Sequence, residues 1–194
     1  MNSIAADTSF FSCFFCYLED LDKLFYLLDN YSFYIGTNIL NEIPKDLRKD
    51  GMFISKITMG DEYDYVSLME PYFGRKESHL DDGEYQAIGM AYYLQEEGDL
   101  KYLIIDERIA NKFVIKHFKI LKPFLRGTIG FLRDCCCIDN KLEPDDTLKI
   151  LNDIKYLVEN STIRSRPCSL DKKRYEEIID PVILKIMRVD YGGF

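Results

Sequence analysis

Hydrophobic positions along the first two thirds of the chain alternate between short continuous runs and the wider spacing of amphipathic helices. Continuous runs of this length are typical of strands that are buried on both faces of a sheet. They lie at residues 3–6, 32–35, 52–58 and 102–105, with a further short one at 118–121. Helical spacing fills the segments between them, so the alternation favours a parallel sheet with helices on both faces.

Helices are predicted where apolar residues recur every three or four positions between helix-breaking residues. The predicted helices cover residues 8–30, 37–43, 61–73, 80–97 and 107–117, followed by two more at 143–159 and 170–188. Gly98 stands where the C-terminal glycine of a helix belongs. We therefore expect one α/β domain over residues 1–137, and a C-terminal helical extension over residues 138–194 that packs on the same domain.

Composition and charge narrow the classes of function. The chain has 194 residues, of which 47% are hydrophobic and 30% charged, and this suits a single globular core. The formal net charge of −8 argues against a protein that coats nucleic acid through its overall charge, so any such binding must rest on local basic groups. The apolar run at residues 10–18 is too short to span a bilayer and is flanked by acidic residues. We expect no signal peptide, no membrane anchor and a cytoplasmic location.

Six cysteines are expected to be reduced in that location. Cys13 and Cys16 form a CxxC pair, and residues 135–137 offer further thiols for a zinc site. The alternative is that these thiols are packed in the core, because the CxxC lies within an apolar helical segment. The sequence contains no Gly-rich dinucleotide loop, no GxxxxGK phosphate loop and no nucleophile elbow, which argues against those enzyme classes.

Four carboxylates from separate parts of the chain are candidates for a common site. Asp7 and Asp106 directly follow predicted strands, whereas Glu42 and Glu84 lie on predicted helices. Because ligands of a parallel sheet bind beyond the carboxyl ends of its strands, these side chains could meet at one edge. Their mutual repulsion would be relieved by Mg²⁺ or Mn²⁺, which prefer oxygen ligands and stabilise charge on a phosphoryl group. The alternative is that each carboxylate caps a helix or faces solvent.

The motifs around these carboxylates resemble those of the PIN-domain nucleases, in particular the branch with an LDxGE motif. The matching segments are DTS at 7–9, NILNEI at 38–43, LDDGEYQAIGMA at 80–91, LIIDERIANK at 103–112 and GTIGFL at 127–132. The resemblance implies a PIN-like three-layer α/β/α sandwich with a five-stranded parallel sheet. It also implies metal-dependent cleavage of RNA, often by the toxin of a toxin–antitoxin pair, so that an antitoxin protein and a homodimer become expected partners.

Carried over by position, the resemblance makes Asp7, Glu84 and Asp106 metal ligands, and Glu42 a fourth member of the catalytic pocket. Three residues are outer candidates that would contact these ligands or bound water: Asp81, Glu107 and Thr128. Asp81 could equally cap a helix, and Thr128 could be a turn residue between two glycines. The chain departs from the branch at Glu107, where a second Asp is common.

A basic segment at residues 112–126 offers contacts to a nucleic acid. Its candidate substrate-binding residues are Lys112, Lys116, Lys119 and Arg126. Phenylalanines interleave with these charges, and exposed aromatic rings could stack on single-stranded bases, although core packing is the commoner role of such residues. The leading hypothesis is thus a Mg²⁺- or Mn²⁺-dependent ribonuclease, and the alternative is a catalytically silent module of the same fold that binds RNA or a protein partner.

Overall fold

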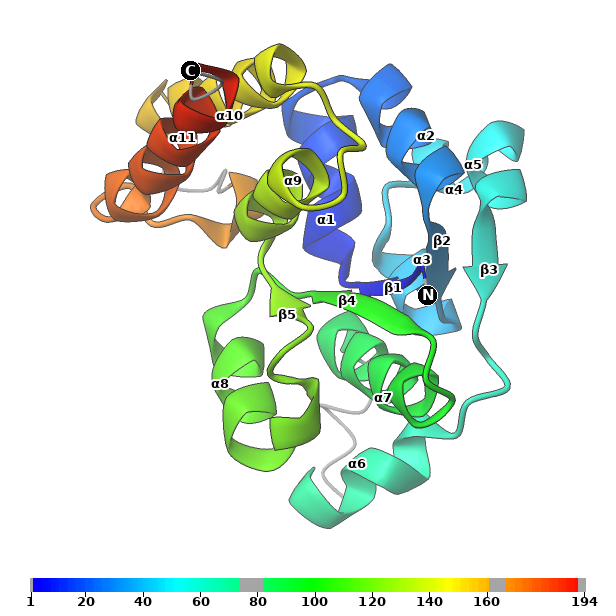
Figure 1. Cartoon of the computed structure of the whole chain (residues 1–194). Helices are drawn as coiled ribbons and strands as arrows, with labels where there is room; N and C mark the ends of the chain where they lie inside the picture. Colours follow the sequence, from blue (N-terminus) through cyan, green and yellow to red (C-terminus); the bar gives the residue numbers. More distant parts are fainter. Residues whose placement is uncertain (1, 74–81, 161–166, 192–194) are drawn as a thin grey trace.

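A parallel β-sheet organises the chain. The computed structural model describes residues 2–73, 82–160 and 167–191. Within this described part the sheet has five strands in the order β3-β2-β1-β4-β5, all of them parallel. The strands are β1 Ser3–Ala6, β2 Ser32–Ile35, β3 Ile57–Met59, β4 Leu100–Ile104 and β5 Leu125–Arg126. The predicted α/β class with a five-stranded parallel sheet is confirmed (Figure 1).

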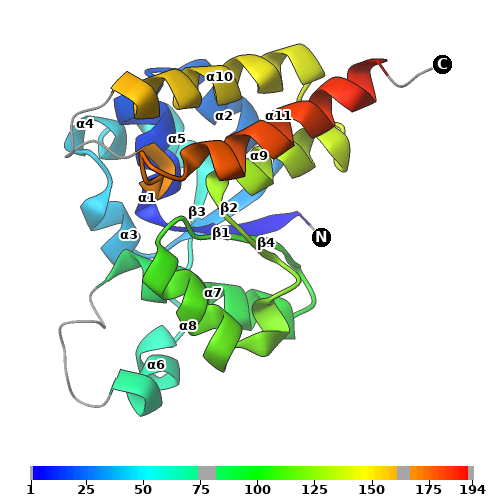
Figure 2. The ribbon, with the colours of Figure 1, turned by 90° about the vertical axis from the view of Figure 1, so that its left-hand side faces the viewer.

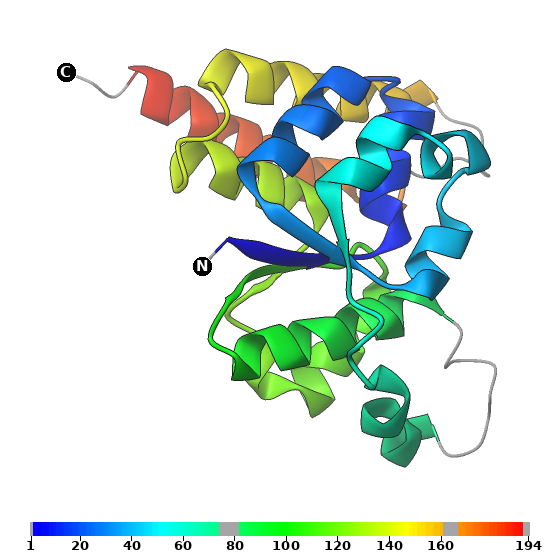
Figure 3. The ribbon, with the colours of Figure 1, turned by 90° about the vertical axis from the view of Figure 1, so that its right-hand side faces the viewer.

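Helices cover both faces of this sheet and form an α/β/α sandwich. They are α1 Thr8–Ser12, α2 Leu21–Asn30, α3 Thr37–Glu42, α4 Lys45–Arg48, α5 Gly51–Lys56, α6 Tyr65–Phe73, α7 Gly83–Glu96, α8 Arg108–His117, α9 Thr128–Cys137, α10 Pro144–Asn160 and α11 Tyr175–Tyr191. Helices α6, α7 and α8 lie on one side of the sheet, and α1, α2, α5 and α9–α11 lie on the other (Figures 2 and 3).

The central position of β1 in the sheet explains why polar and apolar residues do not alternate in the first hydrophobic run. Its four residues are all buried, because β2 and β4 pair with its two edges while α7 covers one face. A strand in this position needs apolar or small side chains on both faces. The same argument applies to β4, of which only Lys101 is partly exposed.

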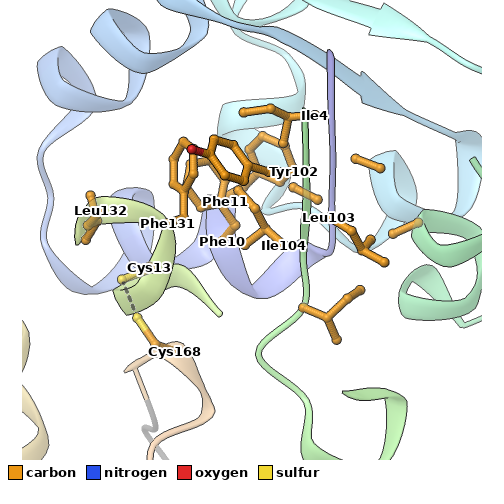
Figure 4. Close-up of a cluster of buried hydrophobic side chains, with 14 of the residues drawn as sticks. Ile4, Phe10, Phe11, Cys13, Tyr102, Leu103, Ile104, Phe131, Leu132 and Cys168 are labelled. Atoms are coloured by element: carbon orange, nitrogen blue, oxygen red, sulfur yellow. Dashed lines mark hydrogen bonds between the residues drawn. The ribbon is translucent and has the colours of Figure 1, made fainter. Parts of the chain in front are cut away.

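Aromatic rings fill the core on the opposite face of the sheet. The ring of Phe10 on α1 stacks on Phe33 of β2, with centroids 5.2 Å apart, and meets the edge of Phe131 on α9 at 5.6 Å. Tyr102 of β4 also packs against Phe131 at 5.5 Å (Figure 4). Contacts of this geometry add to the burial of large apolar surfaces. They lock α1 and α9, the two helices that begin beside the candidate site, to the sheet.

The C-terminal helices pack on the same core. Helices α10 and α11 contact each other and α9, and the short 3-10 turn Pro167–Ser169 contacts α1. In that turn the buried Sγ atom of Cys168 lies 3.1 Å from that of Cys13 (Figure 4). Cys16 is exposed, so the CxxC pair does not converge on one site, and the described residues contain no group of cysteine, histidine and acidic side chains suited to a metal.

Two predicted strands are wrong in type or position. Residues 51–56 form α5 because the Asp50 side chain accepts from the N–H groups of Met52 and Phe53 and caps a helix there, leaving only Ile57–Met59 for β3. Residues 119–121 form a 3-10 turn, and the strand follows it at Leu125–Arg126. No helix in the part of the chain that the structure describes is long and apolar enough to cross a membrane.

Candidate active site

The candidate site lies where the strand order reverses. Strand β1 is followed by connections to β2 on one side, whereas β4 and β5 lie on its other side, so β1 and β4 flank the switch point. Open α/β sheets bind ligands in the crevice outside the carboxyl ends of such strands. Asp7 directly follows β1, and Asp106 comes two residues after β4 ends. The two carboxylates predicted from the sequence therefore meet at the position that this topology favours for a ligand.

Asp7 is wholly buried and holds three backbone groups. Its Oδ1 accepts hydrogen bonds from the N–H groups of Ser9 at 3.0 Å and Phe10 at 3.3 Å, which caps α1. Its Oδ2 accepts from the N–H of Asp106 at 3.0 Å. Asp7 can therefore cap a helix and belong to the acidic site at the same time. One oxygen of Asp7 caps the helix, and the other ties the end of β1 to the segment after β4.

Asp106 is held by the first residue of α9. The N–H of Thr128 donates to Oδ1 at 2.8 Å, and its hydroxyl donates to Oδ2 at 2.6 Å. Thr128 is fully buried, so these bonds are shielded from water. Burial raises the pKa of Asp106, and the two bonds from Thr128 oppose that rise. Gly127 permits the approach, because a Cβ there would lie only 3.0 Å from Oδ1.

Glu42 joins three elements at the same edge of the sheet. Its Oε1 accepts from the N–H of Gly83 at 2.8 Å, at the start of α7, and its Oε2 accepts from the hydroxyl of Thr8 at 2.5 Å, at the start of α1. A Cβ at Gly83 would lie 2.6 Å from Oε2. Glu42 is exposed, in contrast to Asp7, so it stands at the rim of the site rather than at its floor.

Electrostatic coupling shows that the carboxylates share one environment. Burial raises the pKa of Asp7 well above its ordinary value, and the negative charges of Asp106 and Glu84 raise it further. Burial also raises the pKa of Glu84, with additional contributions from the charges of Glu42 and Glu107. The charge of Asp7 is therefore close enough to interact with those of Asp106 and Glu84, and a nearby cation would favour the ionised forms of these three groups.

The carboxylates differ in their capacity to bind a metal ion. An ionised carboxylate offers about four lone-pair sites, of which Asp7 uses three and Asp106 uses two in the bonds described above. Glu84 accepts a bond from its own backbone N–H. Among the described residues, no three histidine, cysteine or acidic side chains are grouped so that they could hold an ion. The expected ligand set of Asp7, Glu84 and Asp106 is thus not a preformed cage, although a site with one or two carboxylates and several waters fits Mg²⁺.

The other residues predicted for the site are a helix cap, a residue outside the described part of the chain and three exposed lysines. Glu107 caps α8, with Oε2 accepting from the N–H of Ala110 at 2.7 Å, and Asp81 lies outside the described residues. Lys112, Lys116 and Lys119 are exposed on and just after α8.

Arg126 has a structural role, whereas the sequence predicted that it would bind the substrate. Its Nε donates to buried Asp134 at 2.6 Å, and an Nη donates to the carbonyls of Pro123 and Leu125. These bonds hold β5 to α9, so its guanidinium is committed inside the protein. The phenylalanines of the basic segment pack in or against the core, as the commoner alternative predicted.

Sequence reasoning missed a buried glutamine that positions Glu42. The Gln86 Oε1 accepts from the N–H groups of Asn38 at 3.0 Å and Ile39 at 3.1 Å, and so satisfies the start of α3, the helix that ends at Glu42. Gly36 leaves room for it, since a Cβ there would lie 2.1 Å from Nε2. The available signal was an uncharged polar residue among the apolar positions of the α7 segment.

Comparisons with known proteins assign no relative. No family model matches the chain, and no curated protein or solved structure matches it significantly. The likeness of the motifs to one nuclease family therefore stays a prediction.

Proposed function

We propose that this chain is a Mg²⁺- or Mn²⁺-dependent ribonuclease of the PIN type, which hydrolyses phosphodiester bonds at the acidic site. The observation that supports it most is the pairing of Asp7 and Asp106 at the switch point of the sheet, joined by the Asp106 N–H to Asp7 Oδ2 bond of 3.0 Å. Placing the wholly buried carboxylate of Asp7 beside the half-buried one of Asp106 is costly unless a cation or a proton neutralises the charge. Their order and spacing in the motifs support the same conclusion.

The residues have distinct roles in this proposal. Asp106 and Glu84 would hold the ion with lone pairs that the bonds described above leave open. Asp7 orients Asp106 by accepting from its N–H, and would offer one further lone pair. Thr128 fixes both oxygens of Asp106, and Glu42 positions the starts of α1 and α7 at the rim. When bound, a hard divalent cation supplies positive charge against the charge that develops on the phosphoryl oxygens.

An antitoxin partner, a homodimer and a cytoplasmic location belong to the same proposal. They rest on the family resemblance alone.

The test is cleavage of a pool of single-stranded and structured RNA in Mg²⁺, Mn²⁺ or EDTA. Asp106→Asn is the informative variant, because an amide can accept from the Thr128 N–H and donate to the Thr128 hydroxyl, so that both contacts survive. Asp153→Asn is its matched control, since Asp153 is exposed on α10 and the substitution removes the same charge. We expect metal-dependent cleavage by the wild type and by Asp153→Asn, and none by Asp106→Asn.

Equal activity of the two variants would refute the proposal, since a nuclease contaminant would not depend on Asp106. Absence of cleavage by the wild type in all three conditions would favour the alternative, a catalytically silent module that binds RNA or a protein partner.

A further inference from the structure

A cavity opens beside Asp106, between the sheet edge and the C-terminal segment. Its volume is about 640 Å³, and Asp106 is part of its lining. One side is formed by the start of α8 and by α9, and the other by residues 168–171 and the first half of α11. In Figure 1 these elements meet at the left, where β4 and β5 end. The C-terminal extension thus forms one wall of a space that reaches the candidate site.

Three arginines from three different segments line this cavity. Arg108 begins α8, Arg133 lies on α9 and Arg174 directly precedes α11. Arg133 shares the buried carboxylate of Asp134 with Arg126, and the distances of the two Nε atoms to it are 2.7 and 2.6 Å. One carboxylate cannot neutralise two guanidinium groups, so this triad keeps one positive charge and holds Arg133 in a fixed orientation.

The other two arginines are more available. Arg108 is exposed, and no described acidic side chain forms a salt bridge with it. Arg174 pairs with Glu177 at 2.9 Å, but both side chains are more than half exposed, and such pairs contribute little free energy. A phosphate group could therefore replace Glu177 as the partner of Arg174 at small cost.

Apolar side chains also line the cavity. Ile129, Ile178 and Val182 contribute to its lining. A planar guanidinium binds a phosphate through two parallel hydrogen bonds, and aliphatic side chains offer a surface for the face of a base. This volume is typical of a site for one small organic group, which favours an unpaired nucleotide over a duplex as the occupant.

We propose that this cavity binds the single-stranded RNA substrate, with Arg108 and Arg174 contacting backbone phosphates on the way to Asp106 and with Arg133, which Asp134 holds in place, adding positive charge to the wall. The inference rests on the proposed ribonuclease function and deepens it. It makes the C-terminal extension a wall of the substrate site, and it places the basic contacts on different residues from the lysines of α8.

The test measures binding rather than cleavage. A short fluorescent single-stranded RNA is titrated with the full chain in EDTA, and its anisotropy is followed at several salt concentrations. The variants are the double substitution Arg108→Gln/Arg174→Gln, the single substitution Glu177→Gln, and Arg188→Gln. Arg188 is a matched control, because it is exposed on α11 and outside the cavity lining.

We expect the double variant to bind about tenfold or more weakly. The slope of log K against log salt should fall by about 1.4, since each lost phosphate contact to a single strand changes it by about 0.7. Glu177→Gln should bind more tightly, because it frees Arg174, and Arg188→Gln should bind as the wild type does. A duplex of the same sequence should bind more weakly than the single strand.

Several results would overturn the inference. Wild-type affinity and salt slope in a double variant with an unchanged circular dichroism spectrum would show that the arginines do not contact RNA, and metal-dependent cleavage could still stand. Equal affinity for duplex and single strand would refute the cavity as the binding site. A wild type that neither binds nor cleaves RNA would remove both proposals together.

Discussion

The hydroxyl of Thr128 offers a direct test of how the site handles its buried charge. Thr128→Val keeps the shape of the side chain but removes the 2.6 Å bond to Oδ2 of Asp106, while the backbone N–H bond to Oδ1 remains. A hydrogen bond to a charged group contributes about 1.5–3 kcal/mol, and one to a neutral group about 0.5–1.5 kcal/mol. Burial of the added methyl group stabilises the variant by about 0.8 kcal/mol, which offsets part of this loss.

The cost of Thr128→Val should therefore depend on whether Asp106 is ionised. At about pH 8, where the carboxylate is charged, the variant should lose about 1–2 kcal/mol in free energy of unfolding. At about pH 4 the raised pKa of Asp106 favours its neutral form, so the loss should be smaller, with a limit of about 0.7 kcal/mol for the neutral group. Loss of the hydroxyl bond should also raise the pKa of Asp106 further, because that bond stabilises the ionised form.

Urea unfolding in EDTA at both pH values measures these differences. Thr128→Ser is the control, because it keeps the hydroxyl and loses a buried methyl group, so its cost should be the same at both pH values. A valine variant whose cost does not change with pH would refute the reasoning, since the hydroxyl would then not be interacting with an ionised carboxylate.

Two other predictions follow from the geometry of the site. The pKa values of Asp7, Asp106 and Glu84 are raised in the folded chain, so the contribution of these groups to metal-free stability should be fully present below the unfolded values of about 4 and should be lost as pH rises through the folded values. The melting temperature of the wild type relative to that of Asp106→Asn should therefore fall as pH rises in EDTA and fall less in Mg²⁺, and a rise in EDTA would contradict this reasoning. Gly83→Ala should displace the exposed carboxylate of Glu42 with a small loss of stability, about 1 kcal/mol, and a larger loss of cleavage, and unchanged cleavage would show that this placement of Glu42 is not needed.

The sequence was sufficient to predict the sheet because its inner strands are continuous apolar runs. Residues 3–6 and 32–35 appear as strands with the predicted bounds, since a strand covered on both faces leaves little choice of residue type. The edge strands were harder. β3 has only three residues and β5 two, so neighbouring helical turns dominate the local pattern. Residues 52–58 are β-prone, but the cap that Asp50 provides favours a helix over most of this segment.

The candidate site was predictable as a set of carboxylates but not as a network. Asp7 and Asp106 could be placed from strand ends, because parallel topology sends both to one edge. The network depends on side-chain orientation and burial, which the spacing of residues in the sequence does not reveal. Two examples are the cap that one oxygen of Asp7 forms on α1 and the bond from Arg126 to Asp134. The arginine cavity was hidden for a similar reason, since its residues come from three segments that only the packed C-terminal extension brings together.

The position of β1 in the middle of the sheet has a consequence for the newly made chain. β1 precedes the other strands in the sequence. Its two edges can both be paired only after β2 and β4 have been made, and β4 begins at residue 100. The partner of Asp106 comes later still, at residue 128, and the second wall of the cavity begins at residue 168. Contacts so distant in sequence form slowly, and domains fold as units during translation. A chain proposed to cleave RNA would thus complete its site only after the segment that begins at residue 168 has been made and has packed on the sheet.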